Sequence, residues 1–303
     1  MGQAVGIQAE TDGLLVAGLA EVETAEGSVS PARDAGLRVG DVITAIGGAP
    51  VRTADDFLAA LERAGEKTRV TFVRGGAEKT CTVTPAAAAD GTLQLGLWLR
   101  DGISGIGTVT YCDPATGDYG ALGHGVTDEE SGALLPLRSG SLLTAEIADA
   151  KPGAEGVPGE LIGSIDPDAP LGDVAENSVF GIFGTLAESP DGTPVETAAD
   201  GEVATGPAVI RTTVAGCAPA EYAVEISRVY RESGCTRYLL TVTDEALLNA
   251  TGGIVQGMSG SPILQNGRLV GAVTHVLLND PTKGYGVSID TMLAAAAQYQ
   301  NAA

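Results

Sequence analysis

The sequence is organised around one glycine-rich stretch, residues 252–262, which reads GGIVQGMSGSP. Four glycines and a closing proline surround Ser259 in this stretch. Glycine adopts positive φ without a steric penalty, so the stretch predicts a tight bend that holds the Ser259 hydroxyl out from the backbone. The same bend would aim the amides of Gly257 and Ser259 at one point, as an oxyanion hole requires. The stretch therefore indicates a nucleophilic serine, with a Gly/Ser-rich surface turn as the alternative.

The residues after this stretch predict a β-hairpin. Asn266 and Gly267 separate two apolar runs, residues 263–264 and 268–276. An Asn-Gly pair between apolar runs is a strong hairpin signal. A further segment, GYGV at residues 284–287, predicts a later strand. A serine-bearing bend followed by strands favours the nucleophile interpretation over the surface turn.

Segment 257–262, GMSGSP, resembles the nucleophile region of trypsin-like serine peptidases. Their pattern is GDSGGP, followed by a hairpin and by a strand that lines the substrate cleft. This sequence departs from the pattern at Met258 and Ser261. Gly253 stands where a trypsin-like pocket would carry its selecting charge, so the resemblance implies no preference for basic side chains.

Composition bounds the class of protein. A chain of 303 residues with 44% hydrophobic residues can form two domains with proper cores. The 43 glycines and 4% aromatics favour short strands joined by tight turns, hence a mostly β fold. The formal net charge of −22 argues against a nucleic-acid partner, because phosphate neutralisation needs clustered Lys and Arg. The four cysteines include no Cys-x-x-Cys pair, so no metal or other cofactor is expected. The cysteines are expected to be buried free thiols, or to form one disulfide in the second domain.

The first domain is predicted over residues 3–86. Residues 30–48, SPARDAGLRVGDVITAIGG, closely resemble the PDZ domains of bacterial proteases. PDZ domains bind a peptide as an added strand, with its carboxylate in a nest of backbone amides. By this resemblance Val5, Gly6 and Ile7 would form the nest; the alternative is that Gly6 only permits a turn. Residues 87–98 are predicted as a linker and the start of the second domain.

The second domain, residues 99–303, is predicted to be β-rich with one C-terminal helix. His124 follows a short strand at the end of YGALGH, residues 119–124. The chain has only two histidines, His124 and His275. A serine hydrolase that uses histidine as its base must therefore use one of these two.

The order of motifs resembles the SpoIVB peptidase family over nearly the whole chain. After the PDZ-like segment come YGALGH (119–124), FGIFGTL (180–186) and TGGIVQGMSGSP (251–262). The segments around 274–287 also fit the family. The resemblance implies an N-terminal PDZ domain followed by a trypsin-like double β-barrel serine peptidase domain.

The resemblance also implies a function. Members are serine endopeptidases of sporulation signalling in spore-forming bacteria, and they also cleave themselves. They act outside the cytoplasm, between the forespore membranes, on a membrane-anchored regulator that restrains an intramembrane protease. Release of that protease activates a late sigma factor. Members carry an N-terminal membrane anchor, which is expected to precede this sequence, and the PDZ ligand is expected to be a peptide, with the chain's own as one candidate.

The same resemblance implies site residues. Ser259 is expected to be the nucleophile, His124 the general base, and Asp244 the acid that orients it. The residues also allow Asp244 to be the N-cap of a following helix, and Asp128 to be the acid. The strand that includes Thr274, His275 and Val276 is expected to pair with the substrate main chain, which makes His275 substrate-facing or structural.

Two other classes of protein compete with this interpretation. An HtrA-like quality-control protease would carry its PDZ domain after the protease domain, and the order here is the reverse. A non-catalytic PDZ adaptor would use the second domain only as a scaffold, and the presence of Ser259 and His124 argues against it.

Overall fold

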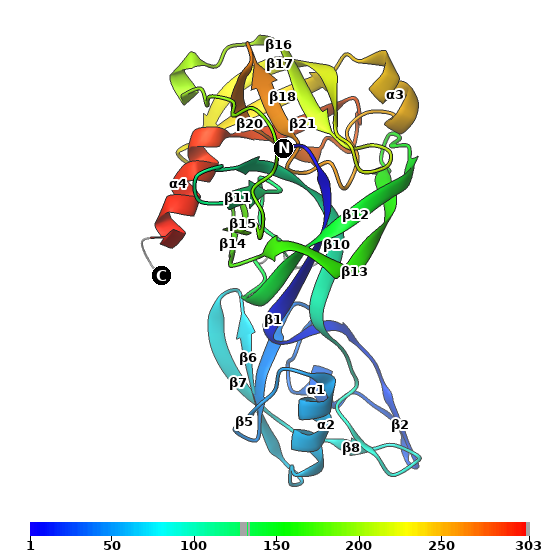
Figure 1. The fold of residues 1–303 in the computed structure, drawn as a ribbon. Helices are drawn as coiled ribbons and strands as arrows, with labels where there is room; N and C mark the ends of the chain where they lie inside the picture. Colours follow the sequence, from blue (N-terminus) through cyan, green and yellow to red (C-terminus); the bar gives the residue numbers. More distant parts are fainter. Residues whose placement is uncertain (128–131, 133, 301–303) are drawn as a thin grey trace. The chain divides into compact units, whose positions relative to one another are not determined.

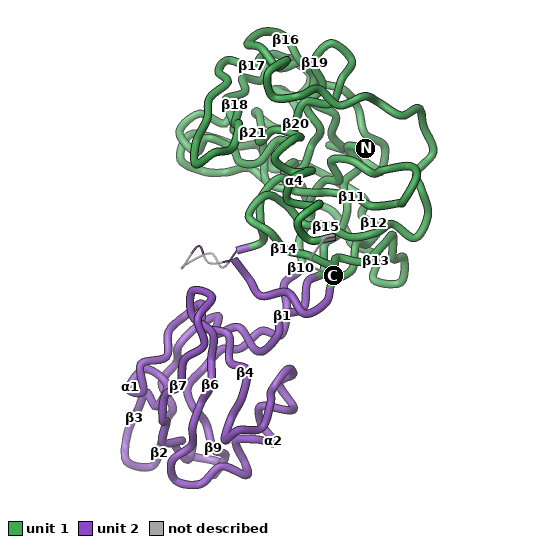
Figure 2. Tube along the Cα trace, turned by 90° about the vertical axis from the view of Figure 1, so that its left-hand side faces the viewer, with its two compact units in different colours: residues 1–8, 104–126, 140–303 green, residues 9–103, 127–139 purple. Residues whose placement is uncertain are grey.

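The computed structural model describes residues 1–127, 132 and 134–300, and the chain divides into two compact units (Figure 2). Unit 1 comprises Met1–Gln8, Ser104–Val126 and Gly140–Ala303, and unit 2 comprises Ala9–Ile103 and Thr127–Ser139. Strands dominate both units, so the prediction of a mostly β fold is confirmed. No helix among the described residues is long and apolar enough to cross a bilayer.

The boundaries differ from the predicted domains, 3–86 and 99–303. Three strands, β1 (Ala4–Leu19), β10 (Leu97–Cys112) and β12 (Leu137–Lys151), contribute residues to both units. The boundaries therefore fall inside strands and not in a separate linker between them. The predicted linker at 87–98 instead contains most of a two-stranded pairing within unit 2, β8 (Ala86–Ala87) with β9 (Leu93–Gln94).

Unit 2 is built on an antiparallel sheet in which β1, β4, β6 and β7 are successive neighbours. Thr53 is the N-cap of α2 and forms a capping box, in which its side chain accepts a hydrogen bond from the Asp56 amide. The Asp41 carboxylate is fully buried and bonds Arg74, with Arg74 Nε 2.6 Å from Asp41 Oδ1. The other elements of unit 2 are β2 (Val22–Thr24), β3 (Gly27–Val29), α1 (Pro31–Asp34), β4 (Val42–Ile46), β5 (Ala49–Pro50), α2 (Ala54–Glu62), β6 (Thr68–Arg74) and β7 (Ala77–Val83).

The C-terminal half of unit 1 is a closed antiparallel barrel in the order β16-β17-β18-β21-β20-β19. All of these strands except β19 are labelled in Figure 1. Its interior is packed with aliphatic side chains and Tyr238, whose hydroxyl donates to Val270 O at 3.0 Å. Asn266 and Gly267 both have positive φ, 53° and 75°, so the predicted hairpin is confirmed as β19–β20. The barrel strands are β16 (Gly206–Thr212), β17 (Ala220–Glu232), β18 (Cys235–Val242), β19 (Pro262–Gln265), β20 (Arg268–Val276) and β21 (Lys283–Ser288).

The rest of unit 1 is a second group of strands, in which β14, β15, β11 and β10 are successive neighbours. Helix α4 packs on this group at β11 and on the barrel at β20 and β21. Met292 of α4 is buried with Leu269 and Val287, which joins the helix to the barrel. The remaining elements are β11 (Asp118–Ala121), β13 (Glu160–Asp173), β14 (Glu176–Ser178), β15 (Gly181–Thr185), η1 (Asp200–Glu202), α3 (Glu245–Thr251) and α4 (Ile289–Gln300).

All four cysteines carry free thiols. Cys81, Cys112 and Cys235 are half-buried and Cys217 is exposed. The thiols are therefore free, as expected, but they are not fully buried. Burial raises the pKa of Cys112, and the nearby Asp113 carboxylate raises it further. A thiol of raised pKa is a poorer nucleophile, so Cys112 is not activated for catalysis.

Candidate active site

The turn that carries Ser259 is held by main-chain bonds to two strands. Gly257 and Gly260 flank Ser259 with φ of 97° and 96°, values that favour glycine. Gly260 N donates to Val273 O of β20 at 2.8 Å, and Ser259 O accepts from the amide of Thr108, on β10, at 2.9 Å. A Cβ at Gly260 would overlap Thr108 O. The glycine at this position therefore lets the turn approach β10 closely.

Ser259 Oγ donates a hydrogen bond to the carbonyl oxygen of Thr274, at 2.6 Å. The pairing of β20 with β21 shifts register between Val273 and His275, which places an irregularity at Thr274. At such a bulge one residue is left out of the ladder, so the Thr274 carbonyl is available to the serine. The Thr274 side chain is buried, and among the described residues its Oγ1 has no hydrogen-bond partner.

The two predicted oxyanion-hole donors lie in the same turn. In the part of the chain that the structure describes, the amides of Gly257 and Ser259 donate no hydrogen bond. The Gly257 carbonyl accepts one from Thr108 Oγ1 at 2.9 Å, which anchors that peptide unit. Both amides are therefore unbonded among the described residues, which the predicted oxyanion hole requires.

His124 lies just beyond β11, after two residues of positive φ. Leu122 has φ of 67° and Gly123 of 69°, and a positive φ at a buried leucine is strained. Leu122 N donates to Thr108 O at 3.2 Å. A Cβ at Gly123 would lie 3.1 Å from Thr274 Cγ2, so this segment packs on the bulge of β20. The structure thus brings the segments of His124 and Ser259 to the same point of β20.

The His124 ring is held in one tautomer. Nδ1 lies 2.8 Å from Gly125 O, and a carbonyl only accepts, so Nδ1 carries the proton. Nε2 is then the unprotonated nitrogen that a general base needs. Burial lowers the pKa of His124, partly offset by the Gly125 carbonyl. No hydrogen bond joins Ser259 and His124 among the described atoms, since the serine proton is directed at Thr274 O.

The second histidine lies beside the first. The ring centroids of His124 and His275 are 4.5 Å apart, with the planes tilted by 34°. Desolvation, followed by the charges of His124 and Arg237, lowers the pKa of His275 to about 4. His275 is therefore neutral near neutral pH: its ring lies against His124, and part of the residue stays exposed on β20.

Asn177, at the centre of β14, is a site residue that the sequence analysis missed. Its Oδ1 accepts from Val126 N at 2.8 Å, and its Nδ2 donates to Val126 O at 2.9 Å. The side chain is buried, so this pair of bonds holds the main chain two residues after His124. The only signal in the sequence was a polar side chain at a strand position that faces inward.

Asp244 is the N-cap of α3, which is the alternative that the sequence left open. Its carboxylate accepts from the amides of Ala246 at 2.9 Å and Leu247 at 3.2 Å, and from Ala223 at 3.1 Å. These bonds lower the pKa of Asp244, and the bond from the Ala223 amide lowers it most. No hydrogen bond joins it to His124 in the described structure, and its orienting role stays a prediction. The other candidate acid, Asp128, lies outside the described residues.

The peptide-binding prediction for Val5, Gly6 and Ile7 needs correction. All three lie in unit 1, within the extended strand β1, and Val5 and Ile7 are buried. A Cβ at Gly6 would lie 2.9 Å from Ile165 Cγ1, so the glycine serves close packing against β13. Unit 2 has another apolar-Gly-apolar segment, Leu95-Gly96-Leu97, at the start of β10, where Gly96 has φ of 71°.

The predicted substrate strand is partly open. Thr274 is buried, His275 exposed and Val276 half-buried. β19 pairs with β20 only as far as Ala272, and beyond it Val273 is bonded to the Ser259 turn. Among the described residues no group of three His, Cys, Asp or Glu side chains could hold a metal ion.

Comparisons with known proteins show the family of the chain. The SpoIVB peptidase S55 family matches residues 91–293, and a PDZ domain matches residues 25–74, inside unit 2. The predicted family and the N-terminal PDZ domain are thereby confirmed. No curated protein matches the chain.

Solved structures show weaker likenesses. The PDZ domain of an SdrC-like protein from Listeria monocytogenes is 25% identical over 30% of this chain and 90% of its own, with a TM-score of 0.24. The Rv3671c protease of M. tuberculosis, in its inactive form, is 15% identical over 65% of this chain and 84% of its own, with a TM-score of 0.40. The family match spans well over half of the 303 residues and contains Ser259 and His124. The chain belongs to the SpoIVB peptidase S55 family, and it is a serine peptidase.

Proposed function

We propose that this serine peptidase is an endopeptidase of sporulation signalling, with Ser259 as nucleophile and His124 as general base. The observation that carries the proposal is the convergence of the segments of both residues on the bulge of β20. Its substrate is a membrane-anchored regulator whose cleavage releases an intramembrane protease that activates a late sigma factor. The reaction takes place outside the cytoplasm, between the forespore membranes, and the enzyme also cleaves its own chain.

The mechanism begins with a rotation of the serine side chain. Ser259 Oγ leaves Thr274 O and donates instead to His124 Nε2, the unprotonated nitrogen of the tautomer that Gly125 O selects. Oγ then attacks the scissile carbonyl, and its proton passes to Nε2. The amides of Gly257 and Ser259 stabilise the oxyanion, where one donor contributes about 3 kcal/mol.

Collapse of the tetrahedral intermediate breaks the C–N bond, and His124 gives its proton to the leaving amine. Water then attacks the acyl-enzyme with His124 again as base, which releases the new carboxylate and restores Ser259. The substrate main chain pairs with Thr274, His275 and Val276 along the edge of β20 that β19 leaves open. Rotation of Ser259 frees the Thr274 carbonyl for this pairing.

The PDZ unit supplies the second contact with a polypeptide. Its peptide site lies within unit 2, which contains the matched PDZ residues 25–74. A peptide from the regulator or from the chain itself would add its main chain there, as PDZ domains bind their ligands.

Covalent labelling tests the catalytic assignment. A fluorophosphonate probe is expected to label the wild-type protein at one serine and to leave Ser259→Ala unlabelled. Ser261→Ala is the matched control, because the Ser261 hydroxyl is buried and donates to Met258 O at 2.7 Å. Equal labelling of wild type and Ser259→Ala would refute the nucleophile.

The substrate is tested separately. Incubation with the extracytoplasmic part of a membrane-anchored sporulation regulator should give one defined cut, absent with Ser259→Ala. Degradation of unfolded casein into many fragments, without cleavage of the regulator, would instead indicate a quality-control protease. A protein that neither labels nor cleaves would be an adaptor.

A further inference from the structure

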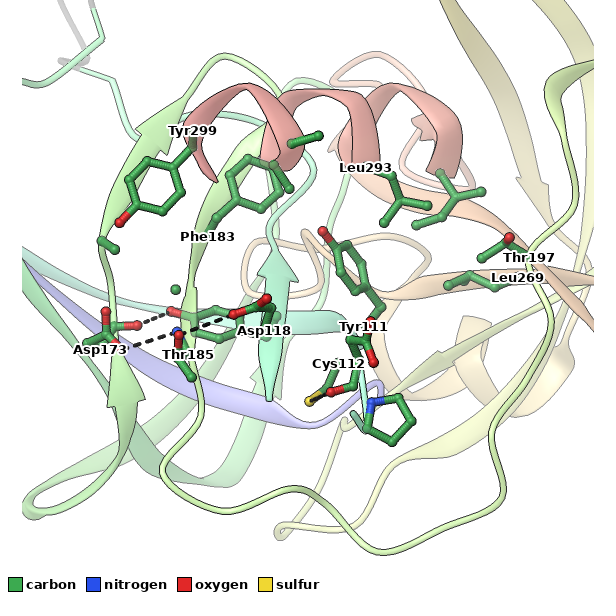
Figure 3. A pocket seen from close by; sticks show the side chains of 18 of the residues that line it. Tyr111, Cys112, Asp118, Asp173, Phe183, Thr185, Thr197, Leu269, Leu293 and Tyr299 are labelled. Carbon is green, nitrogen blue, oxygen red and sulfur yellow. Dashed lines mark hydrogen bonds between the residues drawn. The ribbon is translucent and has the colours of Figure 1, made fainter. Parts of the chain in front are cut away.

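Unit 1 contains a cavity of about 460 Å³ that the proposed chemistry does not use. Its floor is the end of β10 with β11 and β15, and α4 covers it (Figure 3). Leu269 of β20 closes one side, and neither Ser259 nor His124 lines it. The volume lies in the range of small-ligand and side-chain pockets in proteins. It is therefore large enough for one extended side chain with its main-chain atoms.

The walls of the cavity are aromatic and aliphatic. A Cβ at Gly120 would lie 2.8 Å from Tyr111 Cζ, so the Tyr111 ring lies directly against the main chain of β11. Phe183 of β15 is buried and also lines the cavity, and Leu293 and Tyr299 project from α4 (Figure 3). Burial, followed by the charges of Asp118 and Asp113, raises the pKa of Tyr111, which keeps its hydroxyl neutral.

One end of the cavity is acidic. Asp118 Oδ2 accepts from Thr116 Oγ1 at 2.8 Å, and its Oδ1 accepts from Thr185 Oγ1 at 3.3 Å. Asp173 Oδ1 accepts from Thr185 N at 3.1 Å, so Thr185 bonds both carboxylates (Figure 3). Asp113 is the third carboxylate, and no Lys or Arg is among the described residues that line the cavity.

We propose that this cavity binds an arginine or lysine side chain of a basic peptide segment. The aliphatic stem packs between Tyr111 and Leu293, and the cation lies at Asp118 and Asp173. Aromatic faces attract cations, and paired carboxylates accept the forked donors of a guanidinium group. An anionic ligand is disfavoured by the three carboxylates and by the net charge of −22.

The cavity shares a strand with the proposed base. β11 begins at Asp118 and ends at Ala121, and the chain then runs through Leu122 and Gly123 to His124. A peptide bound at Asp118 thus contacts the strand that leads to the active site. Binding at the cavity does not depend on catalysis, so it is tested on the catalytically inactive Ser259→Ala protein.

Cys112 lines the cavity and provides the readout. The probe is N-acetyl-arginine methylamide at about 20 mM, a concentration suited to millimolar binding. It should slow the alkylation of Cys112 by iodoacetamide about fivefold, as measured by mass spectrometry. A fivefold slower rate means that the compound occupies the cavity in most of the protein molecules. Cys217, exposed and outside the cavity, is the internal control.

The citrulline analogue separates charge from shape, because it is nearly isosteric and neutral. It should protect Cys112 less than about twofold, since it lacks the ion pair. Asp118→Asn should abolish protection by the arginine compound, and Asp191→Asn, outside the cavity, should retain it. Equal protection by both compounds, or none by arginine in the wild-type cavity, would overturn the proposal without touching the assignment of Ser259. The two-compound comparison needs no variant at the cavity, so a folding defect in Asp118→Asn leaves it decisive.

Discussion

The turn that carries Ser259 and the segment that carries His124 pack on the same bulge of β20 but are held differently. The Ser259 turn is held by glycine geometry and by main-chain bonds to β10 and β20. The His124 segment depends on the Asn177 side chain, which is 51 residues away in sequence, and on a strained Leu122. The nucleophile is thus held through main-chain contacts that its glycines permit, and the base through a distant side chain.

The largest expected effect tests which histidine is the base. His124→Ala should lower kcat by about 10⁴-fold or more, as loss of a triad residue does in serine peptidases. His275→Ala should keep at least about a hundredfold more activity than His124→Ala, because His275 contacts the base and does not replace it. Peptide hydrolysis by the two purified variants gives the ranking, and the reverse order would show that His275 is the base.

Gly260→Ala tests the rigidity of the Ser259 turn. The new Cβ would overlap Thr108 O at a φ of 96°, so the free energy of unfolding should fall by about 3 kcal/mol or more. Gly267→Ala is the matched control, with φ of 75° and nothing within 4 Å, and should cost about 1 kcal/mol. Urea denaturation compares them, and equal losses would mean that close approach to β10 is unimportant.

Asn177→Ala tests the side-chain support of the base. Two hydrogen bonds to Val126 are lost in a buried setting, which should lower the free energy of unfolding by about 1–3 kcal/mol. Displacement of His124 should reduce kcat by about 10–100-fold. Asn279→Ala, at an exposed position, is the control. Unchanged kcat in folded Asn177→Ala protein would show that His124 is positioned without it.

Asp244→Ala tests the helix cap. Loss of the cap should lower the free energy of unfolding by about 1 kcal/mol or less, given the exposed carboxylate. Because the pKa of Asp244 is lowered on folding, its contribution is present above the unfolded pKa and lost as the pH falls through the folded one. The difference in the free energy of unfolding between Asp244→Ala and the wild type should therefore become smaller below about pH 4. Glu245→Ala, without cap bonds, should change stability less.

The same site separates capping from catalysis. Asp244→Asn retains an acceptor for the helix amides, so its stability should stay close to that of the wild type. A fall of about 10⁴ in kcat despite this stability would assign Asp244 the orienting role that the family resemblance predicts.

The smallest effect concerns pH. Burial lowers the pKa of His124 from its ordinary value of 6.5, so the neutral base persists to more acidic conditions. The acidic limb of kcat/KM against pH should therefore have its midpoint below 6.5. A midpoint above 6.5 would require a negative group near His124, such as an engaged acid.

Much of the site was predictable because its signals are local. A bend built from Gly257 and Gly260, and a hairpin at Asn266, follow from backbone preferences that adjacent residues decide. Asn177 was not predictable, because its partner Val126 lies on a distant segment and asparagine is common in loops. The PDZ carboxylate nest was misplaced for a related reason: Gly6 has the expected pattern, but Ile165 packs against it.

By itself the sequence determined a mostly β chain, an N-terminal PDZ domain, the serine-bearing turn and the family. These depend on local steric preferences and on motif order along the chain. Only the tertiary structure decided where the units divide, which tautomer His124 adopts, and that Asp244 caps a helix. Such properties arise from contacts between residues far apart in sequence, whose geometry exists only once the strands have paired.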